Sequence, residues 1–281
     1  MDPNDILTDR QISDTRIPKI IHYCWFGGAT KSDLIQKCIS SWAKLCPEYR
    51  IVEWNEENWD IQKYPYAYEA HKAGKWAFVS DVARLDILYT YGGIYLDTDV
   101  ELFSQDPFSG LLSRDAFFTF ENERAINTGM CCGTRANNPL IRALLQPYLQ
   151  KTFNVHRIND EINTVINKPV FREMLGIEWN DQSQIVDNIE IITTGKFNSF
   201  AMHYGTRTWD PEQAKYTLHR KKYKDTKLKR FLRNPQYFKF IETKFGEGKL
   251  LKIYTFIAYD LLECGPVYFA KRLLKKLQKK G

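Results

Sequence analysis

The sequence predicts an α/β protein in which helices pack on a mainly parallel sheet. Two observations support this class: an early strand–helix–strand alternation, and a helix that turns at paired glycines into a short strand ending in acidic residues. In the alternation, residues 17–28 and 49–55 have the β-branched and aromatic content of buried strands. Residues 33–46 repeat apolar side chains at helical spacing, with Ser32 as the expected cap and Pro47 as the stop. A helix between two strands usually joins them in parallel.

The second unit ends in two carboxylates. Residues 78–91 predict an amphipathic helix that stops at Gly92-Gly93, and residues 94–97 predict a short strand. Asp97 and Asp99 then lie at the carboxyl end of a central strand, where open α/β sheets place ligand sites. Carboxylates in this arrangement can bind Mg²⁺ or Mn²⁺, with substrate phosphates completing the coordination. A surface turn that uses its aspartates for local hydrogen bonds is the alternative.

Further elements follow along the chain. We expect two strands within residues 115–133 and a helix over 139–150 that begins at Asn138-Pro139. A last strand is expected over 185–193, and the chain from about 215 onward is expected to be helical, basic and aromatic. The predicted domains are therefore residues 1–214 and a C-terminal region over 215–281.

The composition is that of a globular protein with a sizeable core. The chain has 281 residues, of which 43% are hydrophobic and 26% are charged. These values exclude a disordered chain, a collagen and a disulfide-stapled miniprotein. The sequence has no uninterrupted apolar run of about 18 residues, and its start is polar and acidic, so we expect neither a membrane span nor an export signal.

The cysteines show no spacing typical of a zinc site. Without an export signal they should meet a reducing compartment. We therefore expect all six to be reduced and mostly buried thiols: Cys24, Cys38, Cys46, Cys131, Cys132 and Cys264.

The positive charge is concentrated near the C-terminus. Residues 201–281 contain 20 Lys and Arg against seven Asp and Glu, whereas the whole chain has a net charge of only +6. Residues 267–280 separate leucines from lysines in the manner of an interfacial helix, which indicates an anionic membrane surface as partner. A helix packed on its own protein with a solvated basic face is the alternative. Nucleic acid is not expected as a partner, because no recognised nucleic-acid motif accompanies the charge.

Residues 80–99 taken together resemble the DXD region of glycosyltransferase family 32, as found in bacterial capsular polysaccharide transferases and fungal α-mannosyltransferases. Residues 17–28 also resemble the opening segment of that family. The residues that carry the resemblance are Ser80, Asp81, Arg84, Gly92, Gly93, Tyr95, Asp97 and Asp99. The resemblance implies a GT-A type nucleotide-diphospho-sugar transferase fold, with residues 1–214 as the catalytic domain.

The resemblance also implies a set of site residues. Its expected catalytic residues are Asp81, Arg84, Asp97 and Asp99, and its expected metal ligands are Asp97, Asp99 and His203. Its expected nucleotide and donor contacts are Trp25, Gly27, Asp81, Arg84, Asp97, Asn127, Thr208 and Trp209. Three alternatives remain open: an ion pair within the helix for Asp81 and Arg84, a core tryptophan for Trp25, and an ordinary satisfied histidine for His203.

By this resemblance the chain is expected to be a retaining glycosyltransferase that requires Mn²⁺ or Mg²⁺. Its donor would be a UDP- or GDP-linked sugar and its acceptor a glycan or lipid-linked glycan, as in the synthesis of capsule, exopolysaccharide or lipopolysaccharide. Such an enzyme is expected in the cytoplasm, peripheral at the inner face of the cell membrane. A toxin-like enzyme that glycosylates a protein and a catalytically silent sugar-nucleotide-binding module are the alternatives. Residues 162–176 depart from the family's Gly-Pro segment on the acceptor side.

Overall fold

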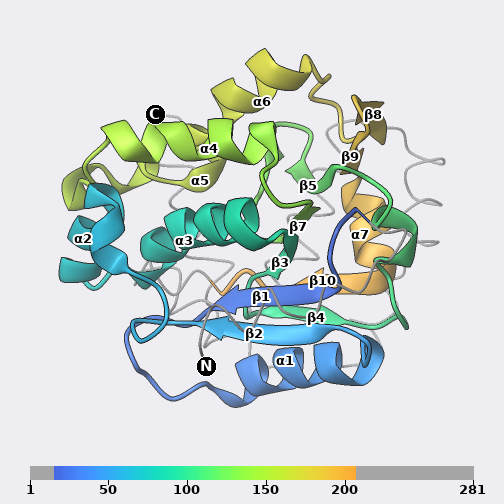
Figure 1. Cartoon of the computed structure of the whole chain (residues 1–281), viewed down its shortest axis with the longest axis horizontal. Coiled ribbons are helices and arrows are strands. Elements are labelled where there is room, and N and C mark those ends of the chain that lie inside the picture. The colour runs from blue at the N-terminus through green and yellow to red at the C-terminus, as the bar shows by residue number, and fades with distance from the viewer. Residues whose placement is uncertain (1–15, 207–281) are drawn as a thin grey trace, which may run out of the picture. The chain divides into compact units, whose positions relative to one another are not determined.

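The computed structural model describes residues 16–206, which form a mixed sheet with helices on both faces (Figure 1). The strands of this sheet, in spatial order, are β2 (Arg50–Trp54), β1 (Ile20–Cys24), β3 (Gly93–Leu96), β7 (Cys131–Thr134), β5 (Ala116–Asn122), β9 (Ile189–Ile192) and β8 (Gln184–Val186), with β6 (Ala125–Ile126) paired to β5. A second sheet pairs β4 (Val100–Leu102) with β10 (Ala201–His203). β3 lies inside the main sheet, as the position of the two aspartates in the sequence predicts. The prediction of a mainly parallel sheet is wrong, because β7 pairs antiparallel with both β3 and β5, and β8 pairs antiparallel with β9.

The helices are shorter and more numerous toward the end of the described region. The α-helices are α1 (Asp33–Leu45), α2 (Pro65–Lys72), α3 (Trp76–Tyr91), α4 (Pro139–Gln150), α5 (Asn163–Ile166), α6 (Lys168–Leu175) and α7 (Thr194–Phe200), and the 3₁₀ helices are η2 (Ile61–Lys63), η3 (Ser109–Leu111) and η4 (Val155–Asp160). α4 has the predicted bounds and begins as expected, because the Asn138 side chain accepts a hydrogen bond from the Leu140 N–H at 2.9 Å.

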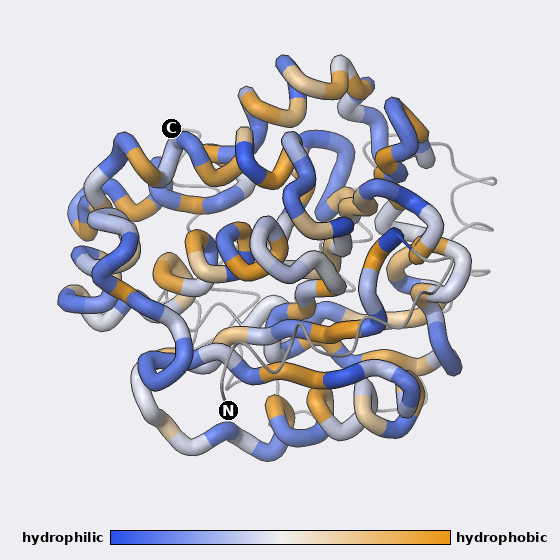
Figure 2. The backbone as a smooth tube through the Cα atoms, in the orientation of Figure 1, coloured by the Kyte–Doolittle hydropathy of each residue, from blue (hydrophilic) through white to orange (hydrophobic). Residues whose placement is uncertain are grey.

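The predicted strand–helix–strand unit is present. β1 and β2 pair in parallel, and α1 connects them. The helix buries Ile35, Cys38 and Trp42, and its hydrophobic positions face the strands in Figure 2. The Trp42 indole N–H donates to the Val100 carbonyl at 2.7 Å, which ties α1 to β4. The helical spacing of the apolar residues thus produces the packing that it predicts.

The prediction that α3 is amphipathic is wrong. Every residue from Phe78 to Leu88 is buried. The reason is that α3 packs on β1, β3 and β7 with one side and against α2 and α4 with the other. The helix ends at Gly92, whose φ of 67° and close approach to the Ala136 backbone leave no room for a side chain.

The prediction of one last strand over 185–193 is also wrong. That segment forms a hairpin, β8 and β9, which turns at Asp187-Asn188. Both turn residues have positive φ, at 46° and 62°, as a two-residue hairpin turn requires. A further strand, β10, follows and carries His203.

The described cysteines are free and buried, as expected: Cys24, Cys38, Cys46, Cys131 and Cys132. Burial raises the pKa of Cys24 to about 12, so its thiol stays protonated at neutral pH. No helix within residues 16–206 is long and apolar enough to cross a membrane. Cys264, the boundary at 214 and the basic segment 267–280 lie outside the described residues, so those predictions stay predictions.

A buried histidine connects β1 to the end of α3. His22 is fully buried, its Nδ1 lies 3.1 Å from the Trp54 indole N–H, and its Nε2 lies 2.9 Å from the Gly92 carbonyl. Since the indole can only donate, Nδ1 must accept and Nε2 must carry the proton, which makes the ring neutral. Burial lowers the pKa of His22 to about 4.

We expect His22 to make the protein less stable in mild acid. The pKa is about 6.5 in the unfolded chain and about 4 in the folded chain, so the unfolded state binds the extra proton between these values. The contribution is complete above pH 6.5 and is lost as the pH falls to 4, a change of about 3 kcal/mol. Urea unfolding of the wild type and of His22→Gln at pH 7 and 4.5 measures this change in the free energy of unfolding. If the two proteins lose the same free energy of unfolding between these pH values, His22 is not the cause.

Candidate functional site

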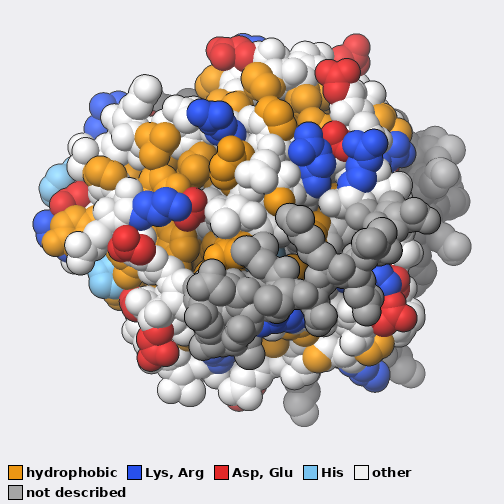
Figure 3. All heavy atoms as spheres, viewed as in Figure 1, with side chains coloured by type: hydrophobic (Ala, Val, Ile, Leu, Met, Phe, Trp, Pro, Cys, Tyr) orange, Lys and Arg blue, Asp and Glu red, His pale blue; other side chains and the backbone are white. Residues whose placement is uncertain are grey.

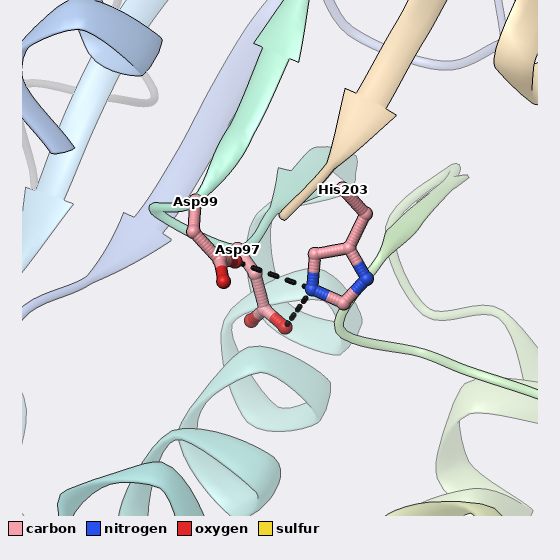
Figure 4. Close-up of side chains that lie close together, drawn as sticks. All are labelled: Asp97, Asp99 and His203. Atoms are coloured by element: carbon pink, nitrogen blue, oxygen red, sulfur yellow. Dashed lines mark ion pairs between the residues drawn. The ribbon is translucent and has the colours of Figure 1, made fainter. Parts of the chain in front are cut away.

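Three side chains with metal-ligand chemistry meet where β3 ends. Asp97 and Asp99 follow β3, and β10 brings His203 beside them by pairing antiparallel with β4, with His203 opposite Val100. His203 Nε2 lies 3.2 Å from Asp99 Oδ1 and 4.0 Å from Asp97 Oδ2 (Figure 4). One ligand atom from each residue lies within 4.8 Å of the other two. The structure therefore brings together the three residues that the resemblance implies as metal ligands.

The charges in this trio favour a cation between them. Burial alone would lower the pKa of His203, but its hydrogen bond to Asp99 and the charges of Asp99 and Asp97 raise that pKa to about 9. In the metal-free protein a proton on His203 therefore balances part of the carboxylate charge at neutral pH. Two carboxylates and one imidazole also form a donor set that suits Mn²⁺ and can accept Mg²⁺. The residues present thus fit the predicted divalent ion.

Asp81 and Arg84 form the ion pair that the sequence left open, and this pair extends to the acidic motif. Arg84 Nη2 lies 3.0 Å from Asp81 Oδ1 and 3.4 Å from Asp97 Oδ1. Burial raises the pKa of Asp81 to about 6, although the Arg84 guanidinium opposes the rise. Arg84 Nη1 is buried and has no hydrogen-bond partner among residues 16–206, so its two N–H groups remain for a ligand. The pair and the metal trio therefore share Asp97 and form one site.

We expect Arg84→Ala to lower the free energy of unfolding by about 3–5 kcal/mol, because it leaves the buried Asp81 carboxylate without its cation. The double variant Asp81→Leu/Arg84→Met should recover most of this loss, since apolar side chains often replace a buried ion pair at little cost. Urea denaturation of the single and double variants compares them. A single variant as stable as the wild type would show that Asp81 does not depend on Arg84.

Gly129 belongs to the site, and the sequence reasoning missed it. A Cβ at this position would lie 2.4 Å from both Arg84 Nη1 and Asp97 Oδ2. The Gly129 carbonyl also accepts a hydrogen bond from the Asp97 N–H at 2.9 Å. The predicted donor contact Asn127 accepts from the Gly129 N–H at 2.8 Å, so its side chain shapes this turn. The signal in the sequence was the Asn-Thr-Gly turn just before β7, where a glycine allows close approach.

Trp25 and Gly27 occupy the loop after β1. Trp25 is half-buried and packs against the hydrophobic core cluster, so the core-tryptophan alternative stays open, and its indole N–H donates to the Ala29 carbonyl at 2.7 Å. The Lys31 ammonium lies 5.3 Å from the centre of its ring. A Cβ at Gly27 would lie 2.5 Å from the indole of Trp76, a second tryptophan that the sequence reasoning missed. Binding of a nucleotide by Trp25 and Gly27 remains a prediction.

The other two predicted nucleotide contacts, Thr208 and Trp209, lie outside the described residues. Their roles stay predictions. His203 is only five and six positions before them, so the described chain reaches the site just before these two residues.

Comparison with known proteins gives the following matches. Residues 32–115 match the family model described as "Glycosyltransferase sugar-binding region containing DXD motif". The chain is 38% identical over 103 residues to inositol phosphoceramide mannosyltransferase 3 of Schizosaccharomyces pombe, a match that covers 30% of this chain and 24% of that protein. It is 30% identical over 115 residues to mannosyl phosphorylinositol ceramide synthase CSH1 of Saccharomyces cerevisiae, covering 34% of this chain and 30% of that protein.

The matches thus span only 24% and 30% of the length of these curated relatives. Among solved structures, PaToxG glycosyltransferase aligns with a TM-score of 0.43 and 19% identity, covering 56% of this chain and 70% of that one. The family match confirms the predicted resemblance and, together with the mixed α/β sheet, the predicted fold class. The matched segment contains Asp81, Arg84, Asp97 and Asp99, so these four residues lie in the part of the chain that is similar to glycosyltransferase sugar-binding regions with a DXD motif.

Proposed function

We propose that this chain is a metal-dependent, retaining glycosyltransferase that moves a sugar from a nucleotide-sugar donor to a glycan or lipid-linked glycan. One observation carries the proposal: Asp97 joins the Asp99–His203 pair to the Arg84–Asp81 pair in a single site. The first pair has the chemistry to hold a cation near a diphosphate. The second offers a fixed guanidinium and a carboxylate to the hydroxyl groups or oxygens of a sugar.

In the proposed mechanism Asp97, Asp99 and His203 would hold Mn²⁺ or Mg²⁺. The ion, when bound, supplies positive charge for the leaving diphosphate. Arg84 is held in place by Asp81 and Asp97, so its unpartnered Nη1 is positioned in advance to donate to an oxygen of the nucleotide sugar. Arg84 and His203 contact different oxygens of Asp97, Oδ1 and Oδ2 respectively.

The retaining outcome is proposed to arise by attack of the acceptor hydroxyl on the same face from which the diphosphate leaves. A covalent route needs a carboxylate free to bond to the sugar. Asp81 Oδ1 is shared between Arg84 and Asn163, and Asp97 and Asp99 face His203. These contacts favour the front-face route, with the leaving phosphate as base.

The acceptor and the location are part of the proposal. Exposed apolar side chains lie on α4, α5 and α6, among them Leu149, Val165 and Met174, and Figure 3 shows hydrophobic side chains gathered over α4 and α6. Such a surface suits an acceptor with a lipid portion. The basic segment 267–280 supports a peripheral position at the inner face of the cell membrane. Both relatives are named for mannosyl transfer, which makes a mannose-bearing donor a specific candidate.

Thermal unfolding with a panel of UDP- and GDP-linked sugars, including a mannose donor, tests the proposal. A bound ligand stabilises the folded protein by about 2.7 kcal/mol at a concentration of 100 Kd. We expect stabilisation only when nucleotide and Mn²⁺ are both present, and release of free sugar from the stabilising donor. Stabilisation without any hydrolysis or transfer would favour the silent binding module. No metal-dependent stabilisation by any nucleotide would overturn the proposal.

The membrane part has its own prediction. Full-length protein should sediment with vesicles that contain anionic lipid, and binding should weaken as salt screens roughly 1 kcal/mol for each lysine or arginine near the surface. Deletion of residues 267–281 should abolish sedimentation and preserve hydrolysis of a soluble donor. Neutral vesicles serve as the control. Absence of binding by the full-length protein, with a loss of thermal stability on truncation, would mean that the segment packs on the protein.

A further inference from the structure

A buried polar cluster lies behind Asp81, and none of its members is among the site residues that the sequence predicts. Its members are Tyr66 on α2, Tyr148 on α4, Glu161 after η4, Asn163 at the start of α5, and Asn167 between α5 and α6. Figure 1 shows these helices grouped on the α3 side of the sheet. The Asn163 amide N–H donates to Asp81 Oδ1 at 3.0 Å, so the cluster is continuous with the Asp81–Arg84 pair.

The cluster contains polar atoms that have no hydrogen-bond partner. Within residues 16–206 the buried atoms of this kind include Tyr148 Oη, Glu161 Oε2, Asn163 Oδ1, Asn167 Nδ2 and Asn167 Oδ1. Native proteins pair nearly all their buried polar atoms, because an unpaired one costs its full desolvation free energy. The Tyr148 and Asn167 side chains interact with each other, but the oxygens of Glu161, Asn163 and Asn167 have no donor among the described residues, which indicates that a partner is missing from the protein itself.

The framework around these atoms is held in place. Glu161 is bound through its other oxygen to the Lys151 ammonium at 2.9 Å, and its backbone carbonyl accepts from the Tyr66 hydroxyl at 3.1 Å. The rings of Tyr66 and Tyr148 pack edge to face with centroids 5.1 Å apart. Burial and the nearby Asp81 carboxylate raise the pKa of Tyr148 well above its usual value, although Arg84 and a hydrogen bond with the Asn167 side chain oppose the rise, so the hydroxyl stays protonated and can donate.

The unpaired atoms suit hydroxyl groups. Asn167 Nδ2 and the Tyr148 hydroxyl can donate, while the oxygens of Asn163, Asn167 and Glu161 accept. A hydroxyl group both donates and accepts, and therefore matches a mixed set of this kind. A phosphate matches it poorly, because three of the five atoms only accept and one belongs to a carboxylate.

We propose that this cluster is the subsite that receives hydroxyl groups of the transferred sugar, with Asn163 and Asn167 determining which sugar is accepted. The proposal rests on the proposed glycosyltransferase function and deepens it. Asn163 has two tasks: it positions Asp81 through its N–H and offers its free oxygen to the sugar. Ordered water in the same place is the competing occupant.

Asn167→Leu distinguishes sugar from water. The substitution has nearly the same shape and removes two unpaired atoms, so we expect the variant to be at least as stable as the wild type. We also expect it to bind nucleoside diphosphate with Mn²⁺ as the wild type does. The additional affinity that the sugar provides, and the preference among nucleotide sugars, should fall at least about 10-fold. Val155→Ala is the matched control, because Val155 is exposed on the neighbouring 3₁₀ helix η4 and should change neither property.

Calorimetric titration with nucleoside diphosphate and with the preferred nucleotide sugar, each with Mn²⁺, measures the two affinities. If the ratio of these two affinities is unchanged in Asn167→Leu, the cluster binds ordered water and not the sugar, and the inference is overturned. Asn163→Ser, whose site is only half-buried, makes the same comparison if Asn167→Leu does not fold. If the wild type fails to bind nucleoside diphosphate at all, the proposed function itself is overturned.

Discussion

Asp99→Asn is expected to abolish metal-dependent nucleotide binding and sugar transfer while the fold remains intact. The substitution keeps the size of the side chain and removes a charge that lies 3.2 Å from His203 Nε2, at the centre of the trio. We expect kcat/KM to fall at least about 100-fold, which corresponds to about 2.7 kcal/mol. Titration of nucleoside diphosphate with and without Mn²⁺ measures the binding, and circular dichroism checks the fold.

A second measurement on this variant does not depend on activity. The hydrogen bond with Asp99 and the charge of Asp99 are the largest causes that raise the pKa of His203 to about 9. The pKa of His203 should therefore fall toward its usual value when residue 99 is neutral. Nuclear magnetic resonance titration of His203 in the metal-free protein follows it. Asp33→Asn is the control, because Asp33 lies exposed in the first turn of α1. Undiminished metal-dependent binding by Asp99→Asn would remove Asp99 from the site.

Gly129→Ala is expected to lower the proposed transfer activity sharply through one added methyl group. Its Cβ would lie 2.4 Å from both Arg84 Nη1 and Asp97 Oδ2, so one or both side chains must move. Misplacement by about 1 Å can cost a factor of 100 in rate, and we expect a loss of this order in kcat. Steady-state kinetics with a saturating donor measure it.

Gly110→Ala is the matched control for this prediction. A Cβ at Gly110 would meet no other atom of the described residues within 4 Å, and the φ of Gly110 is not positive, so an alanine there should be tolerated. We expect Gly129→Ala to lose turnover and metal-dependent binding while its free energy of unfolding changes by much less than the activity. Wild-type kinetics in Gly129→Ala would show that Arg84 and Asp97 can shift without consequence.

Local sequence patterns predicted most of the sheet and two of the site's elements. The spacing of apolar residues located α1, and an asparagine followed by proline located the start of α4. The run of helix, paired glycines and short strand located Asp97 and Asp99 at the end of β3. These features depend on neighbours within a few positions, which is the range that helical and strand periodicities report.

The all-round burial of α3 and the hairpin of β8 and β9 were not predicted. A helix between a sheet and two other helices is buried on every side, although its sequence still shows a helical repeat. The hairpin turn uses Asp187-Asn188, and without a glycine the break in the strand was overlooked. In both cases neighbours in space, or the backbone geometry of a turn, decided the outcome.

The sequence by itself determined the α/β class, the acidic motif and the resemblance that implied His203 as a ligand. Only the tertiary structure decided that β10 sets His203 beside Asp99, that Gly129 packs on Arg84 and Asp97, and that Asn163 holds Asp81. Each of these contacts joins residues between 32 and 104 positions apart. Their partners are chosen by strand register and helix packing, which arise when the whole core forms and leave no periodic signal in the sequence.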